Sequence, residues 1–301
     1  MMAPTRSAAT SRGVAHAGPP VFRGHVTGPG RPPPPTPLHR AAMTARPYVL
    51  AETNWKTVRE TEYEVAILPW GATEAHNYHL PYGTDTIQCD HVGAEAARLA
   101  WEAGAKVVLL PTVPFGVQTG QLDIPLCVNM NPSTQLAVLV DIAESLASQG
   151  ITKLVILNGH GGNDFRQMIR EVQPQVDLFL SLVNWYKVVD PKGHFVDLGD
   201  HGGEMETAVM QHIAPQWVLP LSEAGDGRAK RSRLAAMRDG WAWAPRQWTK
   251  VSPDTGIGDP RAATPEKGRE YFRLVTEAIA GYLVELAAVD PEDLYEDAPA
   301  G

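Results

Sequence analysis

The sequence has few cysteines and no long apolar run. Its 301 residues include only Cys89 and Cys127, without CxxC spacing, which excludes a disulfide framework and a cysteine-type zinc site. No run approaches the roughly 18 apolar residues of a membrane-spanning helix, and no apolar stretch near the N-terminus resembles a secretory signal. These absences predict a cytoplasmic protein with no membrane partner.

Acidic residues are missing from the first 46 positions, which hold six arginines and no lysine. Proline, glycine, alanine and arginine dominate this leader, a composition that cannot bury enough apolar surface to become ordered. We expect residues 1–46 to be disordered; a transit peptide and an upstream start codon, with Met43 as the working start, both stay open. The net charge is −8, so the remainder carries −14, which argues against a nucleic-acid partner.

The remaining chain has the composition of one globular domain, with 44% hydrophobic and 20% charged residues overall. We expect a single domain over 47–290 and a flexible acidic tail over 291–301. Residues 214–262 are irregular and rich in tryptophan, arginine, proline and glycine. This segment is expected to wrap the sheet or to reach a neighbouring subunit.

Short apolar runs alternate with helical patterns along this domain. Runs of valine, isoleucine and leucine without polar alternation indicate strands buried on both faces, and intervening helices indicate parallel connections. The predicted strands span 64–69, 105–111, 153–159 and 176–183, and the predicted helices span 86–103, 132–149, a stretch after Asn163, and 265–287. The pattern predicts a three-layer α/β fold with a mostly parallel sheet.

Three polar clusters lie where a ligand site of such a fold is expected, beyond the carboxyl ends of the strands. They comprise Glu74, His76, His79 and Asp85; Asn158 to Asp164; and Asp200 to Thr207. Carboxylate and imidazole suit zinc, manganese or ferrous iron, and the lack of cysteine favours an open catalytic centre. Two metals about 3.5 to 4 Å apart could share a bridging carboxylate and a water that becomes the nucleophile.

Each cluster also has a simpler interpretation. His79 is expected to support its loop rather than to bind metal, and His91, His194 and His212 are assigned to surface or core. Glu204 and Glu206 are two residues apart on a helix and point in different directions, so that one reaches the site and the other braces it.

Two alternative functions stay open from the residues alone. The glycines of Gly159–Asn163 could cradle a phosphate, which would make the protein a non-catalytic module for a phosphorylated ligand, although GxGxxG and a P-loop lysine are missing. An arginase-like ureohydrolase would need D-x-H-x-D spacing, which is not found.

Taken together, the clusters resemble the creatininase (creatinine amidohydrolase) family. Its E-x-H-x-x-H-L-P-x-G-T-D segment is matched from Glu74 to Asp85, and its N-G-H-G-G-N segment is unchanged at Asn158–Asn163. Its H-A-G-E-x-E-T segment is similar to His201–Thr207, and a closing segment is similar to residues 255–268. The resemblance covers roughly Leu50 to Leu286, and four ordered motifs make it specific.

The resemblance implies a Rossmann-like α/β/α subunit in a homohexamer, with two divalent metals (Zn, Mn or Fe). Such an enzyme hydrolyses a C–N bond of a small cyclic amide or formamide. Glu74 and His160 would hold one metal, His76 the other, and Asp85 would bridge them. Glu206, or failing that Glu204, would supply a further carboxylate. His201 and Glu204 are the predicted catalytic residues, with His201 moving protons between water and the leaving nitrogen.

Departures from the family pattern concern substrate choice. Gly162 stands where creatininase proper has a glutamate, which argues against creatinine as the substrate. Ala75, Asn77 and Tyr78 also differ, as does the loop 115–135, and other branches of the family open formamidopyrimidine-type rings or trim peptides. The residues predicted to line the pocket for a small molecule are Tyr78, Gln118, Gln121, Asn129 and Trp185.

Overall fold

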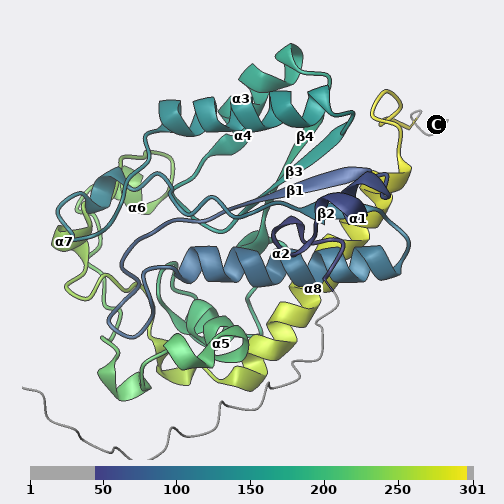
Figure 1. Cartoon of the computed structure of the whole chain (residues 1–301). Coiled ribbons are helices and arrows are strands. Elements are labelled where there is room, and N and C mark those ends of the chain that lie inside the picture. Colours follow the sequence, from purple (N-terminus) through teal and green to yellow (C-terminus); the bar gives the residue numbers. More distant parts are fainter. Residues whose placement is uncertain (1–44, 297–301) are drawn as a thin grey trace, which may run out of the picture. The chain divides into compact units, whose positions relative to one another are not determined.

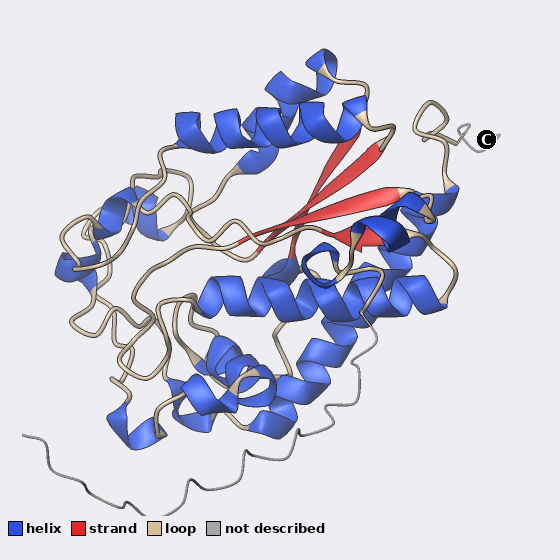
Figure 2. Cartoon of the chain, in the orientation of Figure 1, coloured by secondary structure: helices blue, strands red, loops and turns tan. Residues whose placement is uncertain are grey.

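A four-stranded, all-parallel sheet forms the centre of the computed structural model, which describes residues 45–296. Figure 2 shows the strands in red with helices on both sides. The strands, in the spatial order β2-β1-β3-β4, are β1 (Val65–Trp70), β2 (Val107–Leu109), β3 (Lys153–Asn158) and β4 (Phe179–Asn184). The predicted leader (1–46) lies outside the described residues, except for its last two positions, and so does the end of the predicted tail.

Helices cover the two faces of this sheet in separate layers (Figure 1). Val65 and Ile67 pack into one core cluster, whereas Ala66 and Leu68 pack into the other, because successive strand residues point to opposite faces. The first cluster includes residues of α2 (Thr84–Glu102), α5 (Glu204–Ile213) and α8 (Pro265–Ala288), and the second includes residues of α3 (Pro132–Ser148) and α4 (Phe165–Val172). The predicted three-layer α/β fold is confirmed.

Two helices begin at the proline residues that the sequence places there. Pro265 stands at the first position of α8, and Thr264 accepts a hydrogen bond from the Lys267 amide. Pro132 likewise begins α3, but the Asn131 side chain does not cap that helix and instead accepts from Asn129. Helix α2 begins two residues earlier than predicted, and β2 is shorter than its predicted run.

The segment 214–262 is irregular, as predicted, and contains only short helical turns. They are η5 (Pro215–Trp217), η6 (Leu221–Glu223), α6 (Ala235–Arg238), α7 (Trp248–Val251) and η7 (Pro260–Ala262). Further short elements elsewhere are η1 (Leu50–Glu52), α1 (Trp55–Arg59), η2 (Thr119–Gln121), η3 (Gln173–Gln175) and η4 (Trp185–Lys187). Among residues 45–296, no helix combines the length and apolar character needed to cross a membrane.

The strand order creates a topological switch point at the carboxyl end of the sheet. The chain leaves β1 toward β2 on one side and returns to β3 on the other, so that the loops after β1 and β3 diverge at a switch point. Trp70 pairs with Asn158, and the Gly159 amide donates to the Trp70 carbonyl at 3.0 Å. The polar segments after β1 and β3 therefore start at the same level, side by side.

The contact between α8 and α5 can be tested with two glycines of one helix. A Cβ atom at Gly268 would lie 1.8 Å from the Ala208 carbonyl oxygen, whereas one at Gly281 would meet nothing within 4 Å. We expect Gly268→Ala to lower the free energy of unfolding by about 1–3 kcal/mol. Gly281→Ala should raise it by about 0.5–1 kcal/mol, because alanine favours the helix. Urea denaturation of both variants tests this; equal or reversed effects would contradict it.

Candidate metal centre

A tight loop after β1 folds the first polar cluster back onto the sheet. His76 and Leu80 form an antiparallel bridge, and the Glu74 amide donates to the Tyr82 carbonyl at 3.1 Å. The loop then enters α2, where Asp85 lies in the first turn, a position at which the helix dipole stabilises a carboxylate. Glu74, His76 and Asp85 are thereby brought together, and each is 1% exposed.

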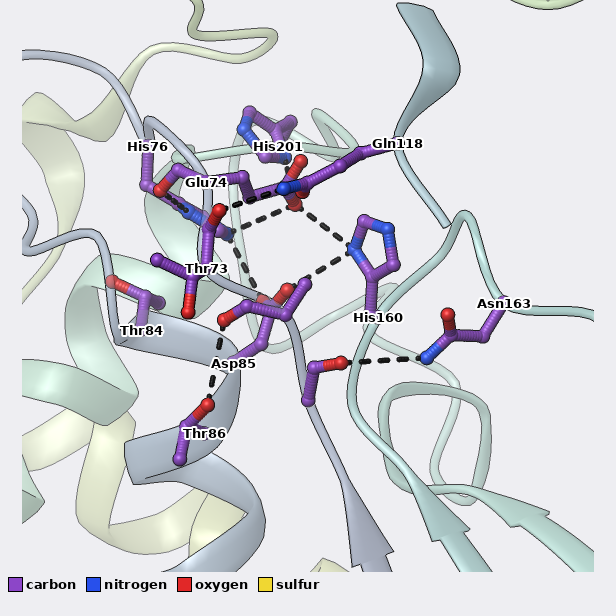
Figure 3. A network of polar contacts seen from close by, with 12 residues as sticks. Thr73, Glu74, His76, Thr84, Asp85, Thr86, Gln118, His160, Asn163 and His201 are labelled. Atoms are coloured by element: carbon purple, nitrogen blue, oxygen red, sulfur yellow. Dashed lines mark hydrogen bonds and ion pairs between the residues drawn. The ribbon is translucent and has the colours of Figure 1, made fainter. Parts of the chain in front are cut away.

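Asp85 lies between the imidazoles of two different loops (Figure 3). His160 Nδ1 is 3.1 Å from Asp85 Oδ2, and His76 Nε2 is 3.0 Å from Asp85 Oδ1. His160 Nδ1 is also 2.9 Å from Glu74 Oε1. On the other side, His76 Nε2 is 3.9 Å from Glu206 Oε1. The carboxylate of Asp85 is therefore shared between two groups of polar side chains.

These groups have the donor sets of two metal sites. One consists of Glu74, Asp85 and His160, and a second of His76, Asp85 and Glu206; within each, the potential ligand atoms lie within 4.8 Å of one another. A third such grouping joins Glu74, His76 and His201. The first two sets have the composition expected for a pair of ions that share one carboxylate.

The histidine tautomers provide a test of whether cations fit here. His76 Nδ1, His160 Nε2 and His201 Nε2 each lie within hydrogen-bond distance of a backbone carbonyl, those of Glu74 (3.2 Å), Val117 (2.9 Å) and Ala75 (2.7 Å). A carbonyl only accepts, so each of these nitrogens carries the hydrogen. In the neutral ring, the other nitrogen then directs a lone pair at carboxylate oxygens. This arrangement requires a proton or a metal cation between them, and the site fits metal ions.

In the metal-free chain, protons occupy these positions. Burial disfavours the charged form of His76, but the carboxylates of Asp85, Glu206 and Glu74 outweigh it and raise its pKa to about 10. For His160, Glu74 and Asp85 likewise overcome burial and raise the pKa well above its ordinary value. Burial and the negative charge of Asp85 raise the pKa of Glu206 to about 7, against the lowering effect of His76. Metal ions would have to displace these protons.

His201 lies against the cluster but in a different environment. Its ring stacks on that of His76 with 4.1 Å between centroids, and the Trp248 ring lies 4.4 Å away. Backbone hydrogen bonds with Ile257 in both directions hold the residue in place. Burial and the charge of His76 lower the pKa of His201 to about 4, so its Nδ1, 3.8 Å from Glu74 Oε1, is unprotonated near neutrality.

Gly162 is a glycine for a steric reason. A Cβ atom there would lie 2.2 Å from the Val117 carbonyl oxygen and 2.4 Å from His160 Nε2. The carbonyl that orients His160 thus occupies the space next to position 162. No carboxylate can enter the site from this position without displacing the loop that carries Val117.

Two predicted site residues contact residues outside the cluster. Glu204 accepts hydrogen bonds from the amides of Val196 (2.7 Å) and Asp197 (2.9 Å), and it forms an ion pair with Lys267. Because these partners already hold its carboxylate, we leave Glu204 out of the proposed catalytic machinery. Trp185 is a core residue, buried in the cluster of α2 and α8, and this position does not suit pocket lining.

The other predicted pocket residues differ widely in exposure. Tyr78 is 60% exposed, and its hydroxyl donates to the Pro253 carbonyl. Gln118 is buried and donates to the carbonyls of Thr73 and Val128. Asn129 accepts from the Gln118 amide, which is an interaction within the loop. Gln121 is fully buried, and its amide nitrogen donates to Glu74 Oε2.

Sequence reasoning missed two residues beside the site. Trp248 covers His201 from α7, and Cys127 donates to Gln121 Oε1 at 3.1 Å. Both come from segments without a recognisable pattern, so only their long-range contacts reveal them. His79 does support its loop, as predicted: its Nε2 is 2.8 Å from Thr207 Oγ1.

The loop Gly159–Asn163 does not resemble a phosphate cradle. The amides of Gly159, His160 and Asn163 already donate to groups of the protein. The Asp164 carboxylate caps the N-terminus of α4, where a phosphate would otherwise bind. This geometry argues against the alternative of a phosphorylated ligand.

Comparison with known proteins agrees with this geometry. The mycofactocin precursor peptide peptidase of Mycobacterium ulcerans (strain Agy99) is 29% identical over 213 residues, which cover 68% of this chain and 79% of that protein. A solved structure from Bacteroides fragilis NCTC 9343, provisionally named a creatinine amidohydrolase, is 44% identical, covers 84% of this chain and all of its own, and has a TM-score of 0.79.

A manganese form of creatininase shares the fold, with 22% identity, a TM-score of 0.65, and coverage of 79% of this chain and 98% of its own. Residues 51–283 of the chain match the family described as creatinine amidohydrolase. The chain therefore belongs to the creatininase family.

Proposed function

We propose that this chain is a binuclear metal-dependent amidohydrolase that cleaves a C–N bond of a small cyclic amide or formamide. The observation that carries the proposal is the arrangement of three buried imidazoles, each with one nitrogen tied to a backbone carbonyl and the other directed at shared carboxylates. Membership of the creatininase family supports the same chemistry.

The ligand assignment follows the two geometric groups. Glu74 and His160 would hold one ion, His76 and Glu206 the other, and Asp85 would bridge them. Zinc, manganese and ferrous iron all suit this set of nitrogen and oxygen donors. When bound, such a pair polarises a substrate carbonyl and lowers the pKa of a coordinated water.

His201 is the proposed proton carrier. Its Nε2 hydrogen is held by the Ala75 carbonyl at 2.7 Å, so that Nδ1 is the atom that takes up and returns a proton. Burial and the charge of His76 lower the pKa of His201 to about 4, so that Nδ1 carries no proton near neutral pH in the metal-free chain. Trp248 packs on the ring and limits its access to water.

The substrate would be recognised by residues that differ from the usual family pattern. Tyr78, from the loop after β1, and Gln118, from the loop 115–135, remain our candidates for contacts with it. The space next to Gly162 is filled by the Val117 carbonyl, so that creatinine, whose enzyme has a carboxylate there, is not our proposed substrate.

Peptide cleavage is a second candidate, favoured by one observation. The Mycobacterium ulcerans relative, which the chain matches over 79% of that protein, is a peptide peptidase. Parallel assays of cyclic amides, N-formyl compounds and short peptides with the metal-loaded protein would separate the two candidates.

Self-association is also part of the proposal. A homohexamer in the cytoplasm is expected from the family resemblance, and Trp241 and Trp243 are 78% and 84% exposed in the irregular segment. Large exposed aromatic side chains are typical of interaction surfaces.

Removing the shared carboxylate tests the metal centre. Protein purified without chelator should contain about two divalent metal ions per chain. Asp85→Asn should lose both ions and all turnover, because this side chain lies in both donor sets. Asp90→Asn, an exposed change on the same helix, should retain both. Metal analysis by mass spectrometry checks this; two ions in Asp85→Asn would refute the shared-ligand assignment.

Metal affinity should depend on pH in a defined direction. His76, with a pKa of about 10, and Glu206, with a pKa of about 7, must lose protons when metal binds, so acid competes with the metal. We expect the affinity to rise between about pH 6 and pH 8, by roughly tenfold per pH unit for each proton displaced. Calorimetry in buffers of different ionisation enthalpy should detect the released protons, and a pH-independent affinity would disprove this competition.

A further inference from the structure

We propose that Gln121 is a positioning residue that fixes the ligating oxygen of Glu74, and that Cys127 holds Gln121 in the required orientation. This inference rests on the proposed metal centre and adds two side chains that determine its affinity for metal ions. The three residues come from the loop after β1 and from the loop that contains η2.

The two oxygens of Glu74 have separate partners. Oε1 faces His160 Nδ1 at 2.9 Å and lies 3.8 Å from both His76 Nε2 and His201 Nδ1. Oε2 accepts a hydrogen bond from Gln121 Nε2. Oε1 is therefore the oxygen that faces the ring nitrogens, and the bond from Gln121 to Oε2 holds the carboxylate in this orientation.

The orientation of the Gln121 amide is determined by both of its neighbours. A carboxylate only accepts, so the NH₂ group must face Glu74, and the carbonyl oxygen then faces Cys127. Cys127 Sγ donates to this oxygen at 3.1 Å and accepts from the Ala75 amide at 3.3 Å. The chain of hydrogen bonds thus returns to the residue next to Glu74 and forms a closed loop.

Glu74 depends on a side chain more than the other two carboxylates do. Glu206 is oriented by the backbone amide of Gly202, and Asp85 by its position in the first turn of α2. Gln121 is completely buried, so water cannot replace its hydrogen bond to Glu74. Loss of this bond would free the Glu74 carboxylate to rotate, and hydrogen-bond partners of metal ligands typically affect affinity by about 10- to 100-fold.

The experiment is a metal titration of the apo-protein, with Mn²⁺ or Zn²⁺ as the probe and no substrate present. Gln121→Met keeps the shape of the side chain and removes the amide. We expect one of the two metal equivalents to bind about 10- to 100-fold more weakly, while the other keeps its affinity within about threefold. Wild-type affinity for both equivalents in Gln121→Met would overturn the inference.

Variants of Cys127 form the matched control pair and do not depend on how Gln121→Met folds. Cys127→Ala removes the donor to Gln121 and should weaken the same equivalent, whereas Cys127→Ser keeps a donor and an acceptor and should restore it. Equal affinities of these two variants would also overturn the inference. A wild-type protein that binds no metal would instead refute the proposed function, so the two failures are distinguishable.

Discussion

Two buried carboxylates, Glu74 and Asp85, and the partly buried carboxylate of Glu206 face three buried imidazoles at the carboxyl end of the sheet. In each imidazole, one ring nitrogen donates a hydrogen bond to a backbone carbonyl, so that the lone pair of the other nitrogen is directed at carboxylate oxygens. Such a set is unfavourable in a protein interior unless positive charge lies within it. Protons supply that charge in the apo-chain, and divalent cations would supply it when bound.

The parallel sheet explains how side chains so far apart in sequence meet. Strands β1 and β3 are neighbours and end at the same level, so the loops that follow them, which carry Glu74 and His160, start side by side. Asp85 is added by the first turn of α2, and Glu206 by the start of α5. Because α5 packs on α8 through the close approach at Gly268, the position of Glu206 depends on contacts well outside the site.

The sequence predicted the parts of the molecule that depend on local pattern. Unbroken apolar runs located the four strands, and the polar residues that follow them include Glu74, His76, Asp85 and His160, which the structure brings together. The sequence could not decide whether Glu204 or Glu206 is the metal ligand, because the difference depends on Lys267 of α8, which forms an ion pair with Glu204.

Loop residues were the hardest to predict. Gln121 was expected to line a pocket, but the structure directs it at Glu74, since the loop 115–135 folds over the site and its path depends on long-range packing. Trp248 and Cys127 lie in segments whose sequence shows no recognisable pattern. Trp185 was also expected to line the pocket, and its ring packs into the core.

The proposed metal centre requires that one pair of ions shares Asp85. Anomalous diffraction at a metal absorption edge, from crystals grown with Mn²⁺ or Zn²⁺, tests it most directly. We expect two peaks about 3.5 to 4 Å apart, one beside Glu74 and His160 and the other beside His76 and Glu206, with Asp85 between them. A single peak, or two peaks that do not both contact Asp85, would contradict it.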